Sequence, residues 1–251
     1  MKKQNTTKPD RILINIGLVI LVSLLFSCKH LGNHSHCDGI VGSGRVVEEF
    51  RNVSYFDSIK VVGSCKLFFR KGPQSLRLLG EDNILPIIDT HVEGSTLVID
   101  SDRPYNSDIG VTAYVSMESI REFAIFGAGK IVGEEDFTTD ELVLEIIGAG
   151  KIELSVMAQS ISSRILGAGS ISLEGRAENH AVEIDGAGRI DAYNLEIRIY
   201  DIIILGAGCC RIFVRYELNV VIAGSGIVYY RGNPSVIQSS IVGIGKIVKI
   251  Q

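Results

Sequence analysis

Apolar and polar residues alternate along much of the second half of the chain, for example in Ile152-Glu153-Leu154-Ser155-Val156. A period of two residues is typical of β-strands that bury one face. The 3.6-residue period of an amphipathic helix is not evident. The pattern therefore predicts an all-β fold.

Pairs of glycines separated by one residue interrupt this alternation at regular intervals of 18 to 21 residues. A fixed period of about 20 residues indicates an architecture of stacked repeats. The seven pairs are Gly127/Gly129, Gly148/Gly150, Gly167/Gly169, Gly186/Gly188, Gly206/Gly208, Gly224/Gly226 and Gly243/Gly245.

Two positions keep the same character in every repeat. The residue two places before the first glycine is always isoleucine: Ile125, Ile146, Ile165, Ile184, Ile204, Ile222 and Ile241. The residue two places after the second glycine is always apolar. We interpret each repeat as one coil of a β-solenoid (right-handed β-helix-like), with these columns stacked inside and the glycines permitting a bend. The same columns predict that Cys210 is buried and that Cys209 points outward.

The region before the glycine ladder is also rich in predicted strands, over residues 58–62, 66–70, 76–79 and 97–100, with a short helical turn within 81–88. Its repeat is less regular, as is expected of a terminal region. We therefore expect a head domain over residues 45–251, with a less regular part (45–126) and regular Gly-x-Gly repeats (127–251).

The N-terminus has the features of a targeting signal. Lys2, Lys3, Lys8 and Arg11 precede an apolar stretch over residues 12–26, which favours a signal peptide. The stretch ends in Leu25-Phe26-Ser27-Cys28, which resembles the lipobox of bacterial lipoproteins. We expect residues 1–27 to be a lipoprotein signal peptide and Cys28 to carry diacylglycerol and palmitate chains that anchor the protein. An uncleaved membrane anchor is the alternative, although a comfortable span needs ~20 apolar residues.

Residues 28–44 are polar and contain several glycines, which favours a flexible tether. This segment includes His30, His34, His36 and Cys37, residue types that bind zinc, nickel or copper. The spacing lacks a matching second ligand pair, so a solvated tether is the preferred interpretation and metal binding the alternative. Whether Cys37 pairs with Cys65 stays open.

Several segments together resemble the family called putative auto-transporter adhesin, head GIN domain. They are 42–49 (GSGRVVEE), 56–61 (FDSIKV), 85–88 (LPII), 94–99 (GSTLVI), the glycine ladder and 229–234 (YYRGNP). The resemblance implies a β-solenoid on envelope proteins that are often lipid-anchored. Most such chains have Gly-Ser-Gly-Asp/Asn in the ladder, whereas the first four pairs of this one have Gly-Ala-Gly followed by Lys, Arg or Ser, so its outward face is more basic.

The charge of the chain argues against nucleic-acid binding. The formal charge is −4, and removal of residues 1–27, with four basic residues and one acidic residue, lowers it to −7. Proteins that bind nucleic acid usually carry a basic surface that neutralises phosphates. We therefore expect no nucleic-acid partner.

Catalytic and cofactor motifs are weak. No glycine pair continues to Gly-x-Gly-x-x-Gly, so nucleotide binding is not predicted, and no cofactor is expected. Glu153 and Asp191 lie two coils apart, ~9.6 Å at the usual strand spacing, which is at the limit for a hydrolytic carboxylate pair. His180 follows Glu178-Asn179 and is predicted to be a turn residue. Tyr229 and Tyr230 suggest a carbohydrate platform, although alternation places one of them inside.

A basic column over the coils is the clearest surface feature, formed by Lys130, Lys151, Arg189 and Lys246 and interrupted by Ser170 and Cys209. Such a column could bind acidic glycans or lipid head groups. The alternative without a ligand is that the lysines and arginines keep a β-rich surface from pairing with other sheets.

The sequence favours a non-enzymatic lipoprotein of the outer membrane, with an adhesin-like face for a glycan or protein. The alternative is a structural scaffold protein of the envelope, and the third hypothesis is a carbohydrate-active enzyme. Display at the cell surface or in the periplasm stays open.

Overall fold

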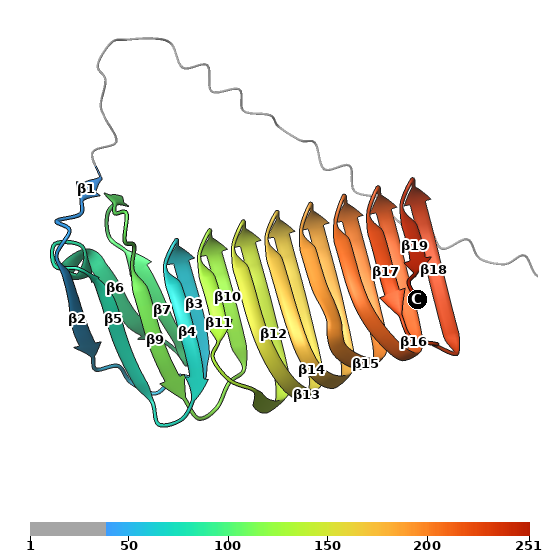
Figure 1. The fold of residues 1–251 in the computed structure, drawn as a ribbon, viewed down its shortest axis with the longest axis horizontal. Helices are drawn as coiled ribbons and strands as arrows, with labels where there is room; N and C mark the ends of the chain where they lie inside the picture. The colour runs from blue at the N-terminus through green and yellow to red at the C-terminus, as the bar shows by residue number, and fades with distance from the viewer. Residues whose placement is uncertain (1–38) are drawn as a thin grey trace, which may run out of the picture. The chain divides into compact units, whose positions relative to one another are not determined.

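The computed structural model describes residues 39–251, most of which lie in β-strands (Figure 1). The first half contains β1 (Ile40–Val41), β2 (Val46–Arg51), β3 (Ser58–Gly63), β4 (Lys66–Lys71), β5 (Ser75–Glu81), the 3₁₀ helix η1 (Leu85–Ile87), β6 (Ile88–Glu93), β7 (Thr96–Ser101), β8 (Tyr105–Asn106) and β9 (Thr112–Met117). The second half contains β10 (Glu122–Gly127), β11 (Lys130–Gly133), β12 (Phe137–Gly148), β13 (Lys151–Gly167), β14 (Ser170–Gly186), β15 (Arg189–Gly206), β16 (Cys209–Gly224), β17 (Ile227–Arg231), β18 (Val236–Gly243) and β19 (Lys246–Lys249).

The second half forms the predicted β-solenoid. From β10 onward, each strand pairs in parallel with strands of the neighbouring coils, and equivalent positions of successive repeats face one another. Figure 1 shows the long strands bending round the solenoid, so that each of β13 to β16 supplies most of a coil. The fold class predicted from the glycine period is confirmed.

The ladder begins one turn earlier than the glycine pattern indicates. β3 pairs in parallel with β10, and β4 with β11, although residues 72–121 separate these strands along the chain. The turn Gly63-Ser64-Cys65 takes the place of a Gly-x-Gly pair. The amide of Ala128 donates to the Gly63 carbonyl at 2.8 Å, and that of Lys130 to the Cys65 carbonyl at 3.1 Å. Part of the region 45–126 therefore belongs to the regular stack.

Steric contacts explain the glycines of the ladder. Gly148 has a φ of +122°, and a Cβ there would lie 2.5 Å from the Gly127 carbonyl oxygen. A Cβ on Gly150 would lie 2.5 Å from Cγ2 of Ile125 in the coil before. Cys65 can replace a glycine because β7 leaves the stack at Ser101 and a pocket of about 370 Å³ opens beside the turn.

The predicted inner columns are buried. The six isoleucines of the first column from Ile125 to Ile222 are inaccessible to solvent, whereas Ile241 in the last coil is 40% exposed. Cys210 is fully buried and Cys209 is partly exposed, as the columns predict. Tyr230 faces inward and packs against the core, so only its neighbour Tyr229 belongs to the outer surface.

The prediction for His180 is wrong. This residue lies within β14, fully buried, and not in a turn. It occupies an inner column between Ile161 of β13 and Tyr200 of β15. The polar residues before it do not end the strand, because the chain turns at Gly175, where φ is +111°, and then continues along the next side of the coil.

The first half closes one end of the stack with antiparallel pairs. β5 lies between β2 and β9, and β6 forms a hairpin with β7. β7 and β9 pair in parallel with β3 and β4, which joins this part to the coils. The predicted strands and helical turn are present as β3, β4, β5, β7 and η1. Ile40 and Val41, which were expected in the tether, form β1 and pair with β8.

Candidate functional site

The predicted basic column exists as a row of neighbouring positions. Lys130 of β11 lies beside Lys151 of β13, and the row continues through Ser170 to Arg189 of β15. Cys209 and Ile227 separate Arg189 from Lys246 of β19. The structure also adds Lys66 of β4, which lies next to Lys130. Three lysines on consecutive coils, Lys66, Lys130 and Lys151, are therefore contiguous, and we call them the lysine column.

Part of the charge of the lysine column is neutralised by Glu153. Its carboxylate pairs with Lys130, with an N–O distance of 2.6 Å, and also with Lys151. Partial burial would raise the pKa of Glu153, but the hydrogen bonds from the two lysines outweigh this effect and lower it. Lys66 has no ion pair within the described residues, and its Nζ lies 4.4 Å from the centre of the Phe68 ring.

An aromatic row crosses the sheet beside the lysine column. We give this name to Phe50 of β2, Arg77 of β5, Tyr114 of β9 and Phe68 of β4, which are direct neighbours across four strands. The rings of Tyr114 and Phe68 stack with centres 5.4 Å apart at an interplanar angle of 15°. The Arg77 guanidinium lies 4.2 Å from the centre of the Tyr114 ring and pairs with Glu48.

A hollow of about 340 Å³ opens along the aromatic row. It has an aromatic wall, two small hydroxyl side chains and charged groups of both signs. The residues lining it are Phe50, Phe68, Arg70, Ser75, Arg77, Tyr114, Val115, Ser116 and Glu134. Arg70 is exposed and has no ion pair in the described part of the protein. The hollow thus offers apolar surface, one free guanidinium and several hydrogen-bonding groups to a ligand.

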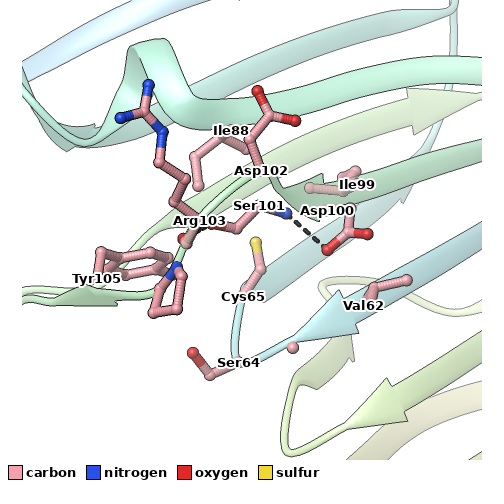
Figure 2. A pocket seen from close by; sticks show the side chains of 12 residues that line it. Val62, Ser64, Cys65, Ile88, Ile99, Asp100, Ser101, Asp102, Arg103 and Tyr105 are labelled. Carbon is pink, nitrogen blue, oxygen red and sulfur yellow. Dashed lines mark hydrogen bonds between the residues drawn. The ribbon is translucent and has the colours of Figure 1, made fainter. Parts of the chain in front are cut away.

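Figure 2 shows the second hollow, the pocket beside the first turn of the ladder. Its floor is apolar and includes Ile88 and Ile99, and the Cys65 thiol points into it. Burial raises the pKa of Cys65 to about 12, so the thiol stays protonated near neutral pH and is a poor nucleophile. The Asp100 carboxylate accepts a hydrogen bond from the Ser101 amide at 2.6 Å. The pocket has the shape of a small binding site but lacks an activated nucleophile.

The carboxylates considered for hydrolysis are both held in ion pairs. Glu153 is engaged by the two lysines, and Asp191 lies 3.3 Å from the Arg211 guanidinium. A general acid needs a raised pKa, and the lowered pKa of Glu153 is opposite to this requirement. The arrangement favours charge pairing between coils over acid–base chemistry.

The remaining predictions near the N-terminus lie outside the described residues 39–251. They are lipidation of Cys28, the signal peptide over residues 1–27, metal binding by His30, His34 and His36, and pairing of Cys37 with Cys65. Within the described part, no helix is long and apolar enough to cross a membrane. No group of three or more His, Cys, Asp or Glu side chains forms a metal site among residues 39–251.

The aromatic row was not predicted from the sequence. Its members come from four segments, and two of the three contacts between them are made by antiparallel strands outside the repeat. A partial signal existed, because Phe68 stands in the pattern Lys66-Leu67-Phe68, with an exposed lysine and a buried leucine before it. Alternation places such a phenylalanine on the outer face, where an aromatic side chain is unusual.

Comparisons with solved structures support the fold. A putative adhesin from Bacteroides fragilis has a TM-score of 0.80 and 24% identity, with 84% of this chain and 100% of that chain covered. A putative lipid binding protein from Parabacteroides distasonis has a TM-score of 0.70 and 21% identity, covering 84% of this chain and 99% of that chain. A putative adhesin from Parabacteroides merdae has a TM-score of 0.68 and 17% identity, covering 85% and 100%.

Among curated proteins, none matches the chain significantly. The family model described as putative auto-transporter adhesin, head GIN domain, matches residues 55–234, which include β3, the glycine ladder up to β17 and most of the aromatic row. The chain therefore belongs to the putative auto-transporter adhesin, head GIN domain family.

Proposed function

We propose that this protein is a non-enzymatic, adhesin-like envelope protein that binds a saccharide in the hollow along the aromatic row. The observation that carries this proposal is the stacked pair Tyr114 and Phe68, which forms one wall of a hollow that also contains Arg70 and Glu134. Family membership supports a role at the cell envelope or surface.

The chemistry of the hollow suits a sugar. The C–H groups of a pyranose ring pack against aromatic side chains, and its hydroxyl groups need donors and acceptors at fixed positions. Arg70 supplies donors, the Glu134 carboxylate supplies acceptors, and the Ser75 hydroxyl supplies both. A volume of about 340 Å³ lies at the lower end of the range of small-molecule sites, which is suitable for one or two sugar rings.

Attachment to the outer membrane by lipids on Cys28 is part of the proposal. The segment between Cys28 and β1 would then act as a tether that holds the solenoid at a distance from the bilayer. A single acyl chain binds a membrane only weakly, so stable anchoring needs more than one, and the diacylglycerol and palmitate chains of a lipoprotein meet this requirement. The lysine column adds positive charge next to the aromatic row, which favours ligands with acidic groups.

A glycan array with the purified full chain tests the proposal. Phe68→Ala is expected to weaken binding of the best saccharide about tenfold, because one aromatic contact of the wall is lost. Phe126→Ala is the matched control, since Phe126 is also partly exposed and also has a lysine over its ring, Lys60 at 4.3 Å, but lies outside the hollow. Equal binding by wild type and Phe68→Ala would contradict the proposed site. Vesicles serve as a second probe, because one structural neighbour is named a lipid binding protein.

Surface labelling of intact cells tests the location. Labelling of the wild type, with release of Cys28→Ala from the membrane fraction, is expected for a lipid-anchored surface protein. Labelling only after the outer membrane is opened would place the protein in the periplasm and favour the structural scaffold. Membrane attachment of Cys28→Ala that persists would contradict anchoring by lipid.

A further inference from the structure

A β-bulge distorts the solenoid where β15 meets β16, in the orange part of Figure 1. Ile197 of β15 pairs with Val214 of β16, but the next pair is Ile199 with Glu217. One residue of β15, Arg198, therefore lies opposite two residues of β16. Bulges are known to redirect side chains and are frequent next to functional sites.

Two consecutive side chains of β16 beside the bulge point toward solvent. Arg215 and Tyr216 are both exposed, whereas alternation would bury one of them. Their side chains and that of Arg198 line one hollow of about 360 Å³, together with Arg176 and Glu178 of β14. Three strands therefore bring three arginines to the same place. We call this site the arginine hollow.

Two of the three guanidinium groups are not neutralised by a neighbouring carboxylate. Arg215 pairs with Glu196. Arg176 and Arg198 have no ion pair within the described part of the protein. Glu178 is the one further carboxylate in the lining, so the hollow has a formal charge of +1. This surplus stands out because residues 28–251 carry −7 in total.

We propose that the arginine hollow binds the monoanionic group of an acidic sugar residue, a carboxylate or a sulfate ester. This inference rests on a saccharide being the ligand, and it adds to the proposed function a second contact and the acidic character of that ligand. Guanidinium groups present parallel N–H donors that match the two oxygens of such an anion. The net charge of +1 matches one negative charge better than the two of a phosphate monoester.

Tyr216 provides the apolar contact for the sugar ring. Its side chain is 43% exposed, and the Arg198 guanidinium lies 4.9 Å from the centre of its ring. The arginine thus keeps the ring in place while part of the ring stays accessible. The site combines one oriented aromatic side chain with two free cations, an arrangement that recognises a charged sugar and not an isolated anion alone.

The sharpest test uses two forms of one ligand, an oligogalacturonate and its methyl ester, because esterification removes the charge and leaves the sugar unchanged. Calorimetric titration of the full chain is expected to show at least about tenfold weaker binding of the acidic form by Arg176→Gln and by Arg198→Gln. The ester is expected to bind both variants and wild type alike. The affinity of Arg198→Lys for the acidic form is expected to be intermediate, since lysine keeps the positive charge but lacks the parallel N–H donors of a guanidinium group. The same titrations are repeated with a sulfated oligosaccharide as the second acidic ligand.

Arg45→Gln is the control, because Arg45 is an exposed arginine near the other end of the solenoid. Equal affinity of wild type, Arg176→Gln and Arg198→Gln for both acidic ligands would overturn the inference, while an effect of Phe68→Ala on the same ligands would leave the proposed function standing. If no saccharide binds at all, the proposed function fails. A titration with sulfate, monitored by the NMR signals of the Tyr216 ring, then tests the anion site. A change in chemical shift that occurs in the wild type and is lost in Arg176→Gln supports the site, and no change in the wild type rejects it.

Discussion

Ser163 and His180 share a hydrogen bond inside the solenoid, with Ser163 Oγ 2.8 Å from His180 Nε2. Both side chains are excluded from solvent, and the Tyr200 ring lies 5.2 Å from the imidazole, centre to centre. The His180 Nδ1 and the Tyr200 hydroxyl find no hydrogen-bond partner among the described residues. A polar layer thus interrupts an otherwise apolar interior between β13 and β15.

This layer predicts acid sensitivity. Burial lowers the pKa of His180 to about 3, against 6.5 for an exposed histidine, so protonation favours the unfolded chain. The contribution of neutral His180 to the free energy of unfolding is therefore present above about pH 6.5 and is lost progressively as the pH falls toward 3. Between pH 6.5 and 4.5 the free energy of unfolding is expected to fall by about 2–3 kcal/mol from this group. Denaturant unfolding at a series of pH values measures the effect.

The double variant Ser163→Ala/His180→Leu is the comparison for that measurement, because it removes both partners of the hydrogen bond and does not leave the Ser163 hydroxyl unsatisfied. Its unfolding free energy is expected to depend less on pH over the same interval. An unchanged pH dependence would show that other groups cause the acid sensitivity.

The glycine ladder predicts a steric penalty that depends on one neighbour. Gly150→Ala places a Cβ against Cγ2 of Ile125 and is expected to destabilise the protein by about 1–3 kcal/mol. Ala149→Ser, in the exposed middle of the same turn, is expected to change stability by less than about 0.5 kcal/mol. Thermal or denaturant unfolding distinguishes the two.

A double-mutant cycle identifies the contact. Ile125→Ala alone is expected to cost about 2–5 kcal/mol, because it leaves a cavity in the inner column. Combined with Gly150→Ala, the loss is expected to be smaller than the sum by about 1 kcal/mol, since the added methyl enters the vacated space. Strict additivity would argue that the backbone, and not Ile125, excludes the side chain.

The three described cysteines are expected to react at different rates. Burial raises the pKa of the Cys210 thiol, as it does for Cys65, whereas Cys209 is partly exposed. Brief treatment of the native protein with a maleimide at pH 7.5 is expected to modify Cys209 and to spare Cys65 and Cys210. Peptide mass spectrometry reads each site separately, and all three are expected to react in denaturant. Rapid native labelling of Cys210 would contradict its place in the inner column.

Removal of Glu153 is expected to improve binding of acidic saccharides. Glu153→Gln frees Lys130 and Lys151 from their shared carboxylate, which makes the lysine column more attractive to anions. Because the groups are partly exposed, the gain is expected to be modest, about two- to fivefold at low salt, and to diminish as salt is added. Glu118→Gln changes the net charge equally at an exposed position outside the column and is expected to have no such effect.

The parts of the fold that could be predicted are those in which each repeat meets the same surroundings. The isoleucines at one offset and the glycines at another recur because every coil packs on a nearly identical coil, so a local rule holds along the whole chain. Cys209 and Cys210 follow that rule. His180 also lies in an inner column, but it was predicted to be a turn residue because the polar residues before it were considered and its partners Ile161 and Tyr200 were not.

The sequence by itself determined the β-solenoid, its period, its inner columns and the basic column, because these follow from alternation and sterics within one repeat. Only the tertiary structure decided which residues meet where strand pairing departs from the repeat. The aromatic row depends on antiparallel pairs that bring Arg77 beside Tyr114, and the arginine hollow depends on a bulge that sets Arg198 opposite Arg215 and Tyr216. Such contacts arise from strand pairing between segments of different length, for which no single sequence period exists.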